Sequence, residues 1–396
     1  MSTRPTPPSA AAGLSVYIHI PFCAVRCGYC DFNTYTATEL GGGGSQREYP
    51  DNACREMDLV LADDRAAGYD YEAISTVFFG GGTPTLLPAD DQARMLEHLT
   101  SLIPLADGAE VTTEANPDSV SRASIARLAD AGVTRMSFGM QSAVPSVLRT
   151  LDRTHDPERV PQAVQWARDA GLQVSLDMIY GTPGERIEDV AATVDAITAM
   201  SPDHVSAYSL IVEGNTKMAR QLRRGELETP DPDFMADAYE LIADRLEADG
   251  FSWYEVSNFS RSHDTRCEHN IAYWRGADWW GIGPGAHRHR NGLRSWNVKH
   301  PSRYAAMLAD ASLPVQGSET VGREDREVER LMLELRLADG LAMDSLDLLG
   351  TDHAREQIDK HIRLGTLDAA AQEAGVLRVT DEGRLLADGV VRDIVS

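Results

Sequence analysis

Segments typical of β-strands alternate with segments typical of helices along most of this 396-residue chain. Six segments rich in β-branched and aromatic residues predict strands. They are residues 16–20, 74–79, 110–114, 135–138, 174–179 and 205–210. Between the last two, an apolar stripe at helical spacing in residues 187–197 predicts a helix packed on a sheet. Such a β–α repeat implies parallel strands, so the fold is predicted to be α/β, a barrel or doubly wound sheet with ligands at the carboxyl ends of the strands.

Three cysteines directly follow the first predicted strand, as Cys23, Cys27 and Cys30 in a C-x3-C-x2-C spacing. An iron–sulfur cluster usually takes four cysteine ligands, so a triad indicates a cluster with one iron open to a small molecule. A structural zinc site would usually show two separate Cys/His pairs. Disulfides are disfavoured, because the chain has only five cysteines and no sign of a secretory leader. The two remaining cysteines, Cys54 and Cys267, stand alone.

A glycine-rich run, Gly-Gly-Gly-Thr-Pro at residues 80–84, follows the second predicted strand. Glycine tolerates positive φ and lets bare backbone approach a ligand, although a simple tight turn is the alternative. Because the carboxyl ends of parallel strands share one edge of the sheet, this run and the cysteine triad are expected to lie together. The combination favours a ligand-binding loop.

These motifs, together with Glu-Ala-Asn-Pro at 114–117 and the run at 177–184, resemble radical S-adenosylmethionine (SAM) enzymes of the coproporphyrinogen oxidase type. The resemblance extends from Ser15 over nearly the whole chain. It implies a partial (β/α)6-type barrel and a [4Fe–4S] cluster held by the three cysteines, with SAM on the open iron as the source of a 5′-deoxyadenosyl radical. It also assigns a set of residues to SAM or its surroundings: Tyr17, Gly81, Gly82, Thr83, Glu114, Gln141, Arg153 and Asp177. Alternatively, Arg153 is a surface cation near Asp152 and Asp177 caps a turn.

Two branches of this family differ just after the triad. The anaerobic coproporphyrinogen III oxidases carry another cysteine two positions later, where this chain has Phe32. The substitution resembles the other branch, the heme chaperones of the HemW type, which bind heme and pass it to hemoprotein targets.

A second motif, His-Asn-Ile-Ala-Tyr-Trp at residues 269–274, resembles the H-N-x-x-Y-W pattern associated with heme in that branch. The resemblance assigns His269, Asn270, Tyr273 and Trp274 to heme binding, with His269 as an iron ligand. Imidazole is a common axial ligand, and aromatic rings offer flat apolar surface to a porphyrin. The alternative is a structural histidine whose aromatic neighbours close the barrel.

Two neighbouring features are weaker candidates for heme contacts. The Cys267 thiolate is a second possible iron ligand. The run His-Arg-His-Arg at 287–290 offers cations to porphyrin propionates, or is a solvated loop.

The pattern predicts three parts of the chain. Residues 1–13 are expected to be a disordered tail, 14–312 a radical SAM barrel with the heme-motif extension, and 313–396 a small, mainly helical, winged-helix-like C-terminal domain similar to that of the oxidase family (HemN-like). A winged helix often indicates DNA binding, but the acidic residues of this part favour protein packing or substrate gating.

Charge and hydropathy narrow the partners. The chain has 61 acidic and 37 basic residues and a net charge of −24, which opposes binding to nucleic acid phosphates. No apolar run approaches the roughly 18 residues that span a bilayer, so no integral membrane segment is expected. The protein is predicted to be cytoplasmic, with heme or porphyrin, a hemoprotein acceptor and an electron donor as partners.

The leading hypothesis is a heme chaperone that binds heme, a [4Fe–4S] cluster and SAM and is not an active coproporphyrinogen III oxidase. An oxygen-independent coproporphyrinogen III oxidase, which decarboxylates its substrate to protoporphyrinogen IX, is the alternative. A radical SAM enzyme acting on nucleic acid or protein ranks third, because the cysteine triad would be the same but the acidic charge argues against nucleic acid.

Overall fold

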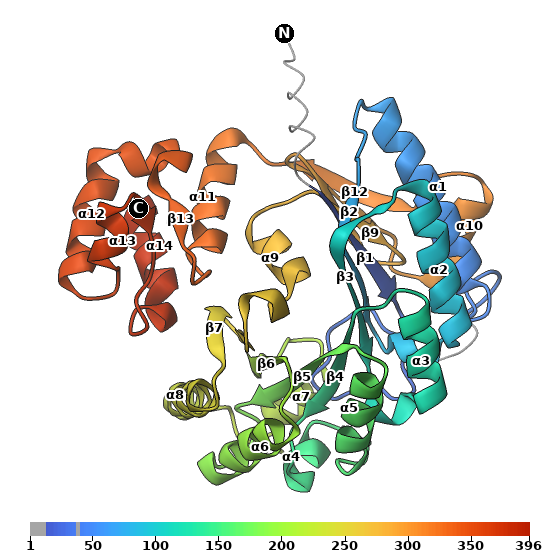
Figure 1. The fold of residues 1–396 in the computed structure, drawn as a ribbon, viewed down its shortest axis with the longest axis horizontal. Helices are drawn as coiled ribbons and strands as arrows, with labels where there is room; N and C mark the ends of the chain where they lie inside the picture. The colour runs from blue at the N-terminus through green and yellow to red at the C-terminus, as the bar shows by residue number, and fades with distance from the viewer. Residues whose placement is uncertain (1–12, 37–39) are drawn as a thin grey trace.

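The computed structural model describes residues 13–36 and 40–396. The predicted disordered tail, apart from Gly13, lies outside the described residues. Most of the described chain is built around one sheet with the strand order β12-β11-β10-β9-β1-β2-β3-β4-β5-β6-β8-β7. The sheet curves, and helices cover its outer face (Figure 1).

Six strands in sequence order form the parallel centre of the sheet. They are β1 (Leu14–Ile20), β2 (Ile74–Gly81), β3 (Leu105–Ala115), β4 (Arg135–Gln141), β5 (Gln173–Tyr180) and β6 (His204–Ser209). All six predicted strands are present, and the predicted α/β class is confirmed. Strand β3 begins at residue 105, earlier than predicted. Its first residues are mostly small or polar and at least partly exposed, so they show no apolar pattern from which a strand could be predicted.

Helices follow these strands, and most of them pack on the outer face of the sheet. They are α1 (Tyr49–Ala66), α2 (Ala89–Leu102), α3 (Arg122–Asp130), α4 (Pro145–Thr150), α5 (Arg159–Asp169), α6 (Ile187–Met200), α7 (Lys217–Arg223) and α8 (Pro232–Ala248). In α6, Val190, Val194 and Ile197 of the predicted stripe are buried. Strand β1 is covered on both faces, with every residue buried except half-buried Tyr17, as is typical of a parallel strand.

Shorter strands extend the sheet at both edges. On one side, β9 (Trp279–Ile282) pairs parallel with β1, and β10 (His287–Arg290), β11 (Leu293–Asn297) and β12 (Val315–Thr320) follow in antiparallel order. On the other side lie β8 (Asn258–Ser260) and β7 (Ser252–Glu255). The sheet therefore continues to residue 320, past the predicted domain boundary at 312.

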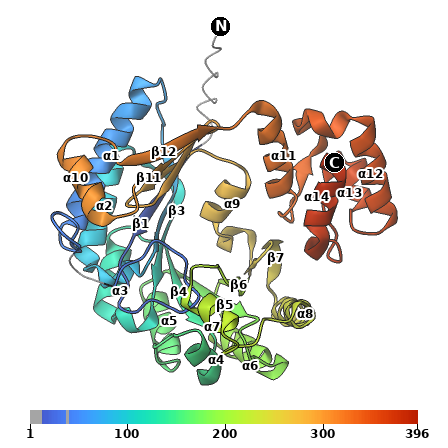
Figure 2. The ribbon, with the colours of Figure 1, turned by 180° about the vertical axis from the view of Figure 1, so that it is seen from behind.

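The C-terminal part is mainly helical and has a hydrophobic core of its own, which includes Leu331, Leu335, Ile358 and Val390. Its helices are α11 (Arg323–Glu334), α12 (Asp352–Arg363), α13 (Ala369–Glu373) and α14 (Ala387–Val395), beside a small antiparallel pair, β13 (Leu341–Ala342) and β14 (Val376–Leu377). Helix α10 (Pro301–Ala309) packs on α1. Helix α9 (Glu268–Trp274) lies between the sheet and α11 (Figures 1 and 2).

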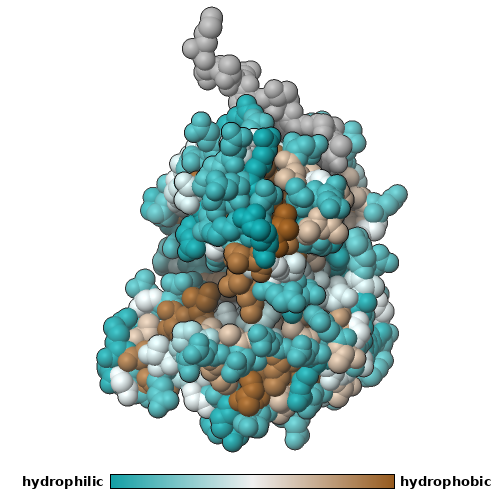
Figure 3. Space-filling view, turned by 90° about the vertical axis from the view of Figure 1, so that its left-hand side faces the viewer, coloured by the Kyte–Doolittle hydropathy of each residue, from teal (hydrophilic) through white to brown (hydrophobic). Residues whose placement is uncertain are grey.

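The face that carries the C-terminal part is mostly hydrophilic, with hydrophobic residues gathered across its middle and lower regions (Figure 3). None of the helices in the described ranges is long and apolar enough to cross a membrane.

Candidate functional site

The three cysteines lie on a loop after β1 that backbone hydrogen bonds hold in place. The Cys23 N–H donates to the carbonyl of Tyr35 at 2.9 Å, and the Gly28 N–H donates to that of Leu151 at 3.2 Å. The carbonyl of Gly28 in turn accepts the N–H of Met218 in α7 at 2.9 Å. The loop is thus fixed by parts of the chain that follow β4 and β6.

The three thiols are free of disulfides. Burial raises the pKa of Cys23 to about 11 and also raises the pKa of Cys30. The Arg153 guanidinium donates to Sγ of Cys27 at 3.6 Å and brings a positive charge to the triad. In the part of the chain that the structure describes, no three His, Cys, Asp or Glu side chains are placed to hold one metal ion. In a four-iron cluster, each of the three thiolates would bind a different iron.

A cavity of about 480 Å³ opens beside the cysteine loop, at the carboxyl ends of the parallel strands. It is lined by most of the residues predicted for the cluster and for SAM: Cys23, Cys27, Cys30, Gly81, Gly82, Thr83, Glu114, Gln141, Arg153 and Asp177. The fold therefore brings together residues from five strands and their following loops. Phe32, where the oxidases carry cysteine, lines the same cavity.

The glycine turn after β2 already uses its backbone N–H groups within the protein. The Gly81 N–H donates to Oε2 of Glu114 at 3.1 Å, and the Gly82 N–H donates to the carbonyl of Ile20 at 2.8 Å. The Thr83 N–H is bonded to the start of the cysteine loop. Backbone contacts between this turn and a ligand therefore fall to its carbonyl oxygens, which suit an amine donor.

Two carboxyl groups stand on the inner wall of this cavity. Burial, and after it the charge of Asp177, raises the pKa of Glu114 to about 8. Burial raises the pKa of Asp177 to about 6, although the Ser137 hydroxyl donates to its carboxylate at 3.0 Å. At neutral pH the Glu114 carboxyl therefore favours the protonated form beside the charge of Asp177, so a positively charged ligand group would be stabilised here.

Two buried polar atoms of lining residues have no hydrogen-bond partner among the described residues: Oε1 of Gln141 and Nε of Arg153. Gln141 also has φ of 63°, a conformation that is uncommon outside glycine. The other end of the Arg153 guanidinium donates to the carbonyl of Gly139 at 2.6 Å. Unpaired buried atoms are rare in proteins, and a polar ligand in the cavity would satisfy both.

Tyr17 does not line this cavity but an adjoining one of about 220 Å³ inside the barrel. Its hydroxyl is bonded to Nδ1 of His19 at 2.9 Å. The two cavities share wall residues, namely Phe32, Gly81, Glu114, Asp177 and Tyr208. The smaller cavity also reaches three residues of the predicted heme motif: His269, Asn270 and Tyr273.

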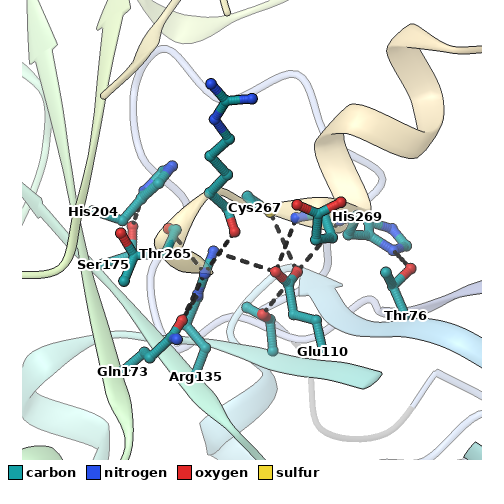
Figure 4. A network of polar contacts seen from close by, with 12 residues as sticks. Thr76, Glu110, Arg135, Gln173, Ser175, His204, Thr265, Cys267 and His269 are labelled. Carbon is teal, nitrogen blue, oxygen red and sulfur yellow. Dashed lines mark hydrogen bonds and ion pairs between the residues drawn. The ribbon is translucent and has the colours of Figure 1, made fainter. Parts of the chain in front are cut away.

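His269 is buried within the barrel, and both of its ring nitrogens are hydrogen-bonded; Figure 4 shows the bond to Thr76. Its Nδ1 is 2.8 Å from the Thr76 hydroxyl, and its Nε2 is 3.1 Å from the Tyr273 hydroxyl. The imidazole stacks on Phe78 with ring centroids 5.0 Å apart. Burial lowers its pKa to about 3, so the ring is neutral. Iron ligation by His269 therefore requires the Tyr273 hydroxyl or the Thr76 hydroxyl to give way.

A buried ion pair fastens α9 to the barrel wall and was not predicted from the sequence (Figure 4). Glu110 of β3 pairs with Arg135 of β4 at 3.4 Å, with exposed fractions of only 8% and 2%. The Glu110 carboxylate also accepts the backbone N–H groups of Glu268 and His269 at 2.9 and 3.4 Å. Arg135 donates to the carbonyl of Thr265 at 3.0 Å. The sequence signal was one charged residue at the start of each predicted strand, Glu110 in residues 110–114 and Arg135 in residues 135–138.

Of the remaining heme candidates, Cys267 lines the small inner cavity with His269, whereas Trp274 lies apart. Trp274 lines none of the cavities described and packs among Tyr254, Cys267 and Leu337. Cys267 is buried, its thiol donates to Glu110, and burial raises its pKa far above the ordinary value. A neutral thiol in this position is a poor iron ligand.

The arginines of the 287–290 run are neither solvated nor turned to a cavity. Arg288 and Arg290 both pair with Asp63 and with the fully buried Asp64 of α1. They therefore fasten β10 to the helix that covers the sheet.

The comparisons with known proteins agree with this architecture. The sequence profile of the Radical SAM superfamily matches residues 17–197. A protein of Mycobacterium tuberculosis named heme chaperone HemW is 46% identical over 390 residues, which cover 98% of this chain and 96% of that protein. A heme chaperone HemW of Bacillus subtilis is 32% identical over 330 residues, which cover 83% and 84%.

Among solved structures, the Escherichia coli coproporphyrinogen III oxidase HemN matches with a TM-score of 0.81 at 22% identity, covering 97% of this chain and 90% of that one. At this identity the likeness shows a common fold. Superfamily membership implies a [4Fe–4S] cluster and SAM, and the free thiols, unpaired polar atoms and buried carboxyls beside one cavity fit both groups. The chain belongs to the radical SAM superfamily and, within it, to the family of the proteins named heme chaperone HemW.

Proposed function

We propose that this protein is a heme chaperone, which binds heme together with a [4Fe–4S] cluster and SAM and delivers the heme to hemoprotein targets in the cytoplasm. The observation that carries the proposal is the 46% identity to a named heme chaperone over nearly the full length of both chains. Phe32, in place of the extra cysteine of the oxidases, supports the same branch.

Cys23, Cys27 and Cys30 would hold the cluster, and the 480 Å³ cavity would hold SAM. In the superfamily, an electron from such a cluster cleaves the sulfonium of SAM. The carbonyls of Gly81 and Gly82 would accept hydrogen bonds from the SAM amine.

The other cavity residues would orient the cofactor. Glu114 would become ionised beside its positive charge, since an opposite charge lowers the pKa of a carboxyl group, and Asp177 would supply a second negative charge. Gln141 and Arg153 would use their unpaired atoms on its polar groups. Tyr17 would shape the inner end through the adjoining cavity.

Heme binding would involve the motif on α9, with His269, Asn270 and Tyr273 facing the barrel interior and Trp274 supporting the helix from the other side. His269 is already neutral, so no proton has to leave before it ligates iron. Ligation through Nε2 requires the bond to Tyr273 to break first. In the structure, the Tyr273 hydroxyl occupies Nε2 of His269, so heme binding would require a form of the site in which this nitrogen is free.

The two alternatives are weaker on specific grounds. For coproporphyrinogen III oxidase, the shared fold with HemN is support for architecture alone, and Phe32 departs from the cysteine of that branch. For an enzyme that acts on nucleic acid, the net charge of −24 opposes a polyanionic substrate.

Anaerobic reconstitution with iron and sulfide, followed by hemin titration and a coproporphyrinogen III assay on the same sample, separates these functions. A chaperone binds hemin, transfers it to an apo-hemoprotein and forms no protoporphyrinogen IX. Formation of protoporphyrinogen IX at the rate of a known oxidase, without hemin binding, would reverse the assignment. Cys27→Ala should abolish the visible absorption of the cluster, and Cys54→Ala is the matched control, because Cys54 lies in α1 and lines neither the cluster cavity nor the adjoining one.

A further inference from the structure

The largest of the cavities described, about 970 Å³, lies at the opposite end of the barrel from the cysteines. The amino ends of β1, β2 and β3 form its inner wall, α9 forms its side, and α11 with the β10–β11 turn forms its outer wall. Figures 1 and 2 show α9 between the sheet and α11. This cavity, which we term the outer cleft, has no part in the cluster and SAM site.

Size decides which cavity takes a large ligand. Sites for cofactors and other small molecules usually measure about 300–1,000 Å³. The outer cleft falls within that range, whereas the cavity of about 220 Å³ that contains His269 falls below it. The cavity of about 480 Å³ is the one beside the cysteines.

The walls of the outer cleft suit a flat apolar ring. Tyr71, Tyr273 and Trp279 line it, and the rings of Tyr273 and Trp279 meet edge to face with centroids 4.8 Å apart. Ile271 and Leu333 add aliphatic surface from α9 and α11. Aromatic and aliphatic side chains of this kind supply most of the contact area in porphyrin-sized sites.

The outer wall also offers a cation for a carboxylate. Four arginines line the cleft, and three of them already form ion pairs: Arg275 with Asp339, Arg294 with Glu329, and Arg330 with Glu334. Arg326 forms no ion pair with any described residue and donates only to the Asn291 side chain at 3.3 Å. An acidic group of a ligand would therefore point toward Arg326 on α11, away from Asp70 and Asp107 on the barrel side.

Tyr273 joins the outer cleft to His269. Its ring lines both the outer cleft and the small inner cavity, and its hydroxyl holds Nε2 of His269 at 3.1 Å. Rotation of this one side chain would expose that nitrogen to the outer cleft. The neighbouring histidine of the cleft, His289, has both ring nitrogens bonded to backbone groups, at Ala277 and Gly292.

We infer that the outer cleft is the seat of heme, a planar macrocycle with carboxylate side chains, that Arg326 pairs with a propionate, and that Tyr273 is the gate through which His269 reaches the iron. The inference rests on the proposed chaperone function and adds to it a location, at the end of the barrel remote from the cluster.

Hemin titration of the full-length protein, followed by Soret absorbance, tests this seat. Arg326→Glu should weaken hemin binding by about tenfold or more, because a charge-assisted hydrogen bond is replaced by repulsion. Arg323→Glu is the matched control, since Arg323 lies one turn earlier on α11, is largely exposed and does not line the cleft. Ala272→Trp, which places a bulky ring in the cleft, should lower hemin binding and leave reconstitution of the cluster unchanged.

The gate has a separate readout. His269→Ala should shift the Soret maximum of bound hemin, while the affinity for metal-free protoporphyrin IX stays that of the wild type. Tyr273→Phe, which removes the hydroxyl and keeps the ring, should accelerate the appearance of the ligated spectrum.

The outcomes distinguish the two levels of the proposal. Wild-type protein that binds no hemin overturns the chaperone function itself. Hemin binding that is as tight in Arg326→Glu and Ala272→Trp as in the wild type overturns the seat alone. Circular dichroism of each variant identifies misfolding, and Arg326→Lys, which keeps the charge, should recover most of the affinity.

Discussion

Replacement of Glu110 by Gln should release helix α9 from the barrel. The substitution keeps the shape and one oxygen acceptor for the N–H groups of Glu268 and His269, but it removes the charge that faces Arg135. Loss of one partner from a buried ion pair costs about 3–5 kcal/mol, because the other charge remains buried. Arg135 keeps three neutral acceptors, which are the Gln173 side chain and the carbonyls of Thr265 and Arg266 just before α9. The cost should therefore lie at the lower end of this range, about 3 kcal/mol.

Hydrogen exchange measured by mass spectrometry reports this loss locally. A cost of about 3 kcal/mol raises the population of the state with α9 detached by about 100-fold, and the exchange of peptides spanning residues 268–274 accelerates by the same factor. Peptides from α2, on the far side of the sheet, should exchange as in the wild type.

The matched control is Arg127→Met, which removes an exposed ion pair with Asp90 on the outer helices. It should leave exchange in residues 268–274 unaltered, because exposed pairs contribute little to stability. The reasoning is refuted if Glu110→Gln leaves the exchange of these residues at the wild-type rate, since the buried pair would then not be what holds α9.

Two other perturbations test the cluster side of the barrel. Gly81→Ala should lower the melting temperature more than Gly68→Ala does: both glycines have positive φ, but a Cβ at 81 would lie 2.5 Å from the His19 ring and one at 68 would meet nothing within 4 Å; equal losses would contradict the proposed clash. Burial, followed by the charge of Asp177, raises the pKa of Glu114 from 4.5 to about 8, so the folded state binds its proton more tightly than the unfolded state. That stabilisation is present below pH 4.5 and is lost as the pH rises through 8, so the melting temperature of the cofactor-free wild type should fall over this range relative to Glu114→Gln, and parallel pH profiles would contradict the shift.

The sequence was sufficient for the parallel centre of the sheet, because strands covered on both faces must be rich in apolar and β-branched residues. The short strands at the two edges of the sheet, β7 to β12, were not predicted. Strand β10 reads His-Arg-His-Arg, which has no apolar pattern, and it forms because Arg288 and Arg290 find the carboxylates of α1. These arginines and aspartates are far apart in the sequence, so no local sequence pattern predicts that they pair.

The site shows the same division. Residues at the carboxyl ends of strands, such as Gly81 and Glu114, could be expected to meet at one edge, because the topology alone brings them there. For Tyr17 and Trp274 the motifs predicted a role but not a location. Tyr17 lines the small inner cavity, whereas Trp274 packs in a hydrophobic cluster away from it. The pairing of Glu110 with Arg135 depends on the register between β3 and β4, which the sequence does not reveal.

The hydrogen bond from Met218 to Gly28 means that the cysteine loop can take its final structure only after α7 has been synthesised. The cysteines leave the ribosome early, but the helix that fixes their loop belongs to the second half of the chain. A nascent chain therefore exposes three thiols before it has the backbone contacts that set their spacing. We therefore expect cluster insertion to follow translation of the barrel, because a truncated chain that ends before α7 lacks the contact of Met218 with Gly28 that helps to fix the cysteine loop.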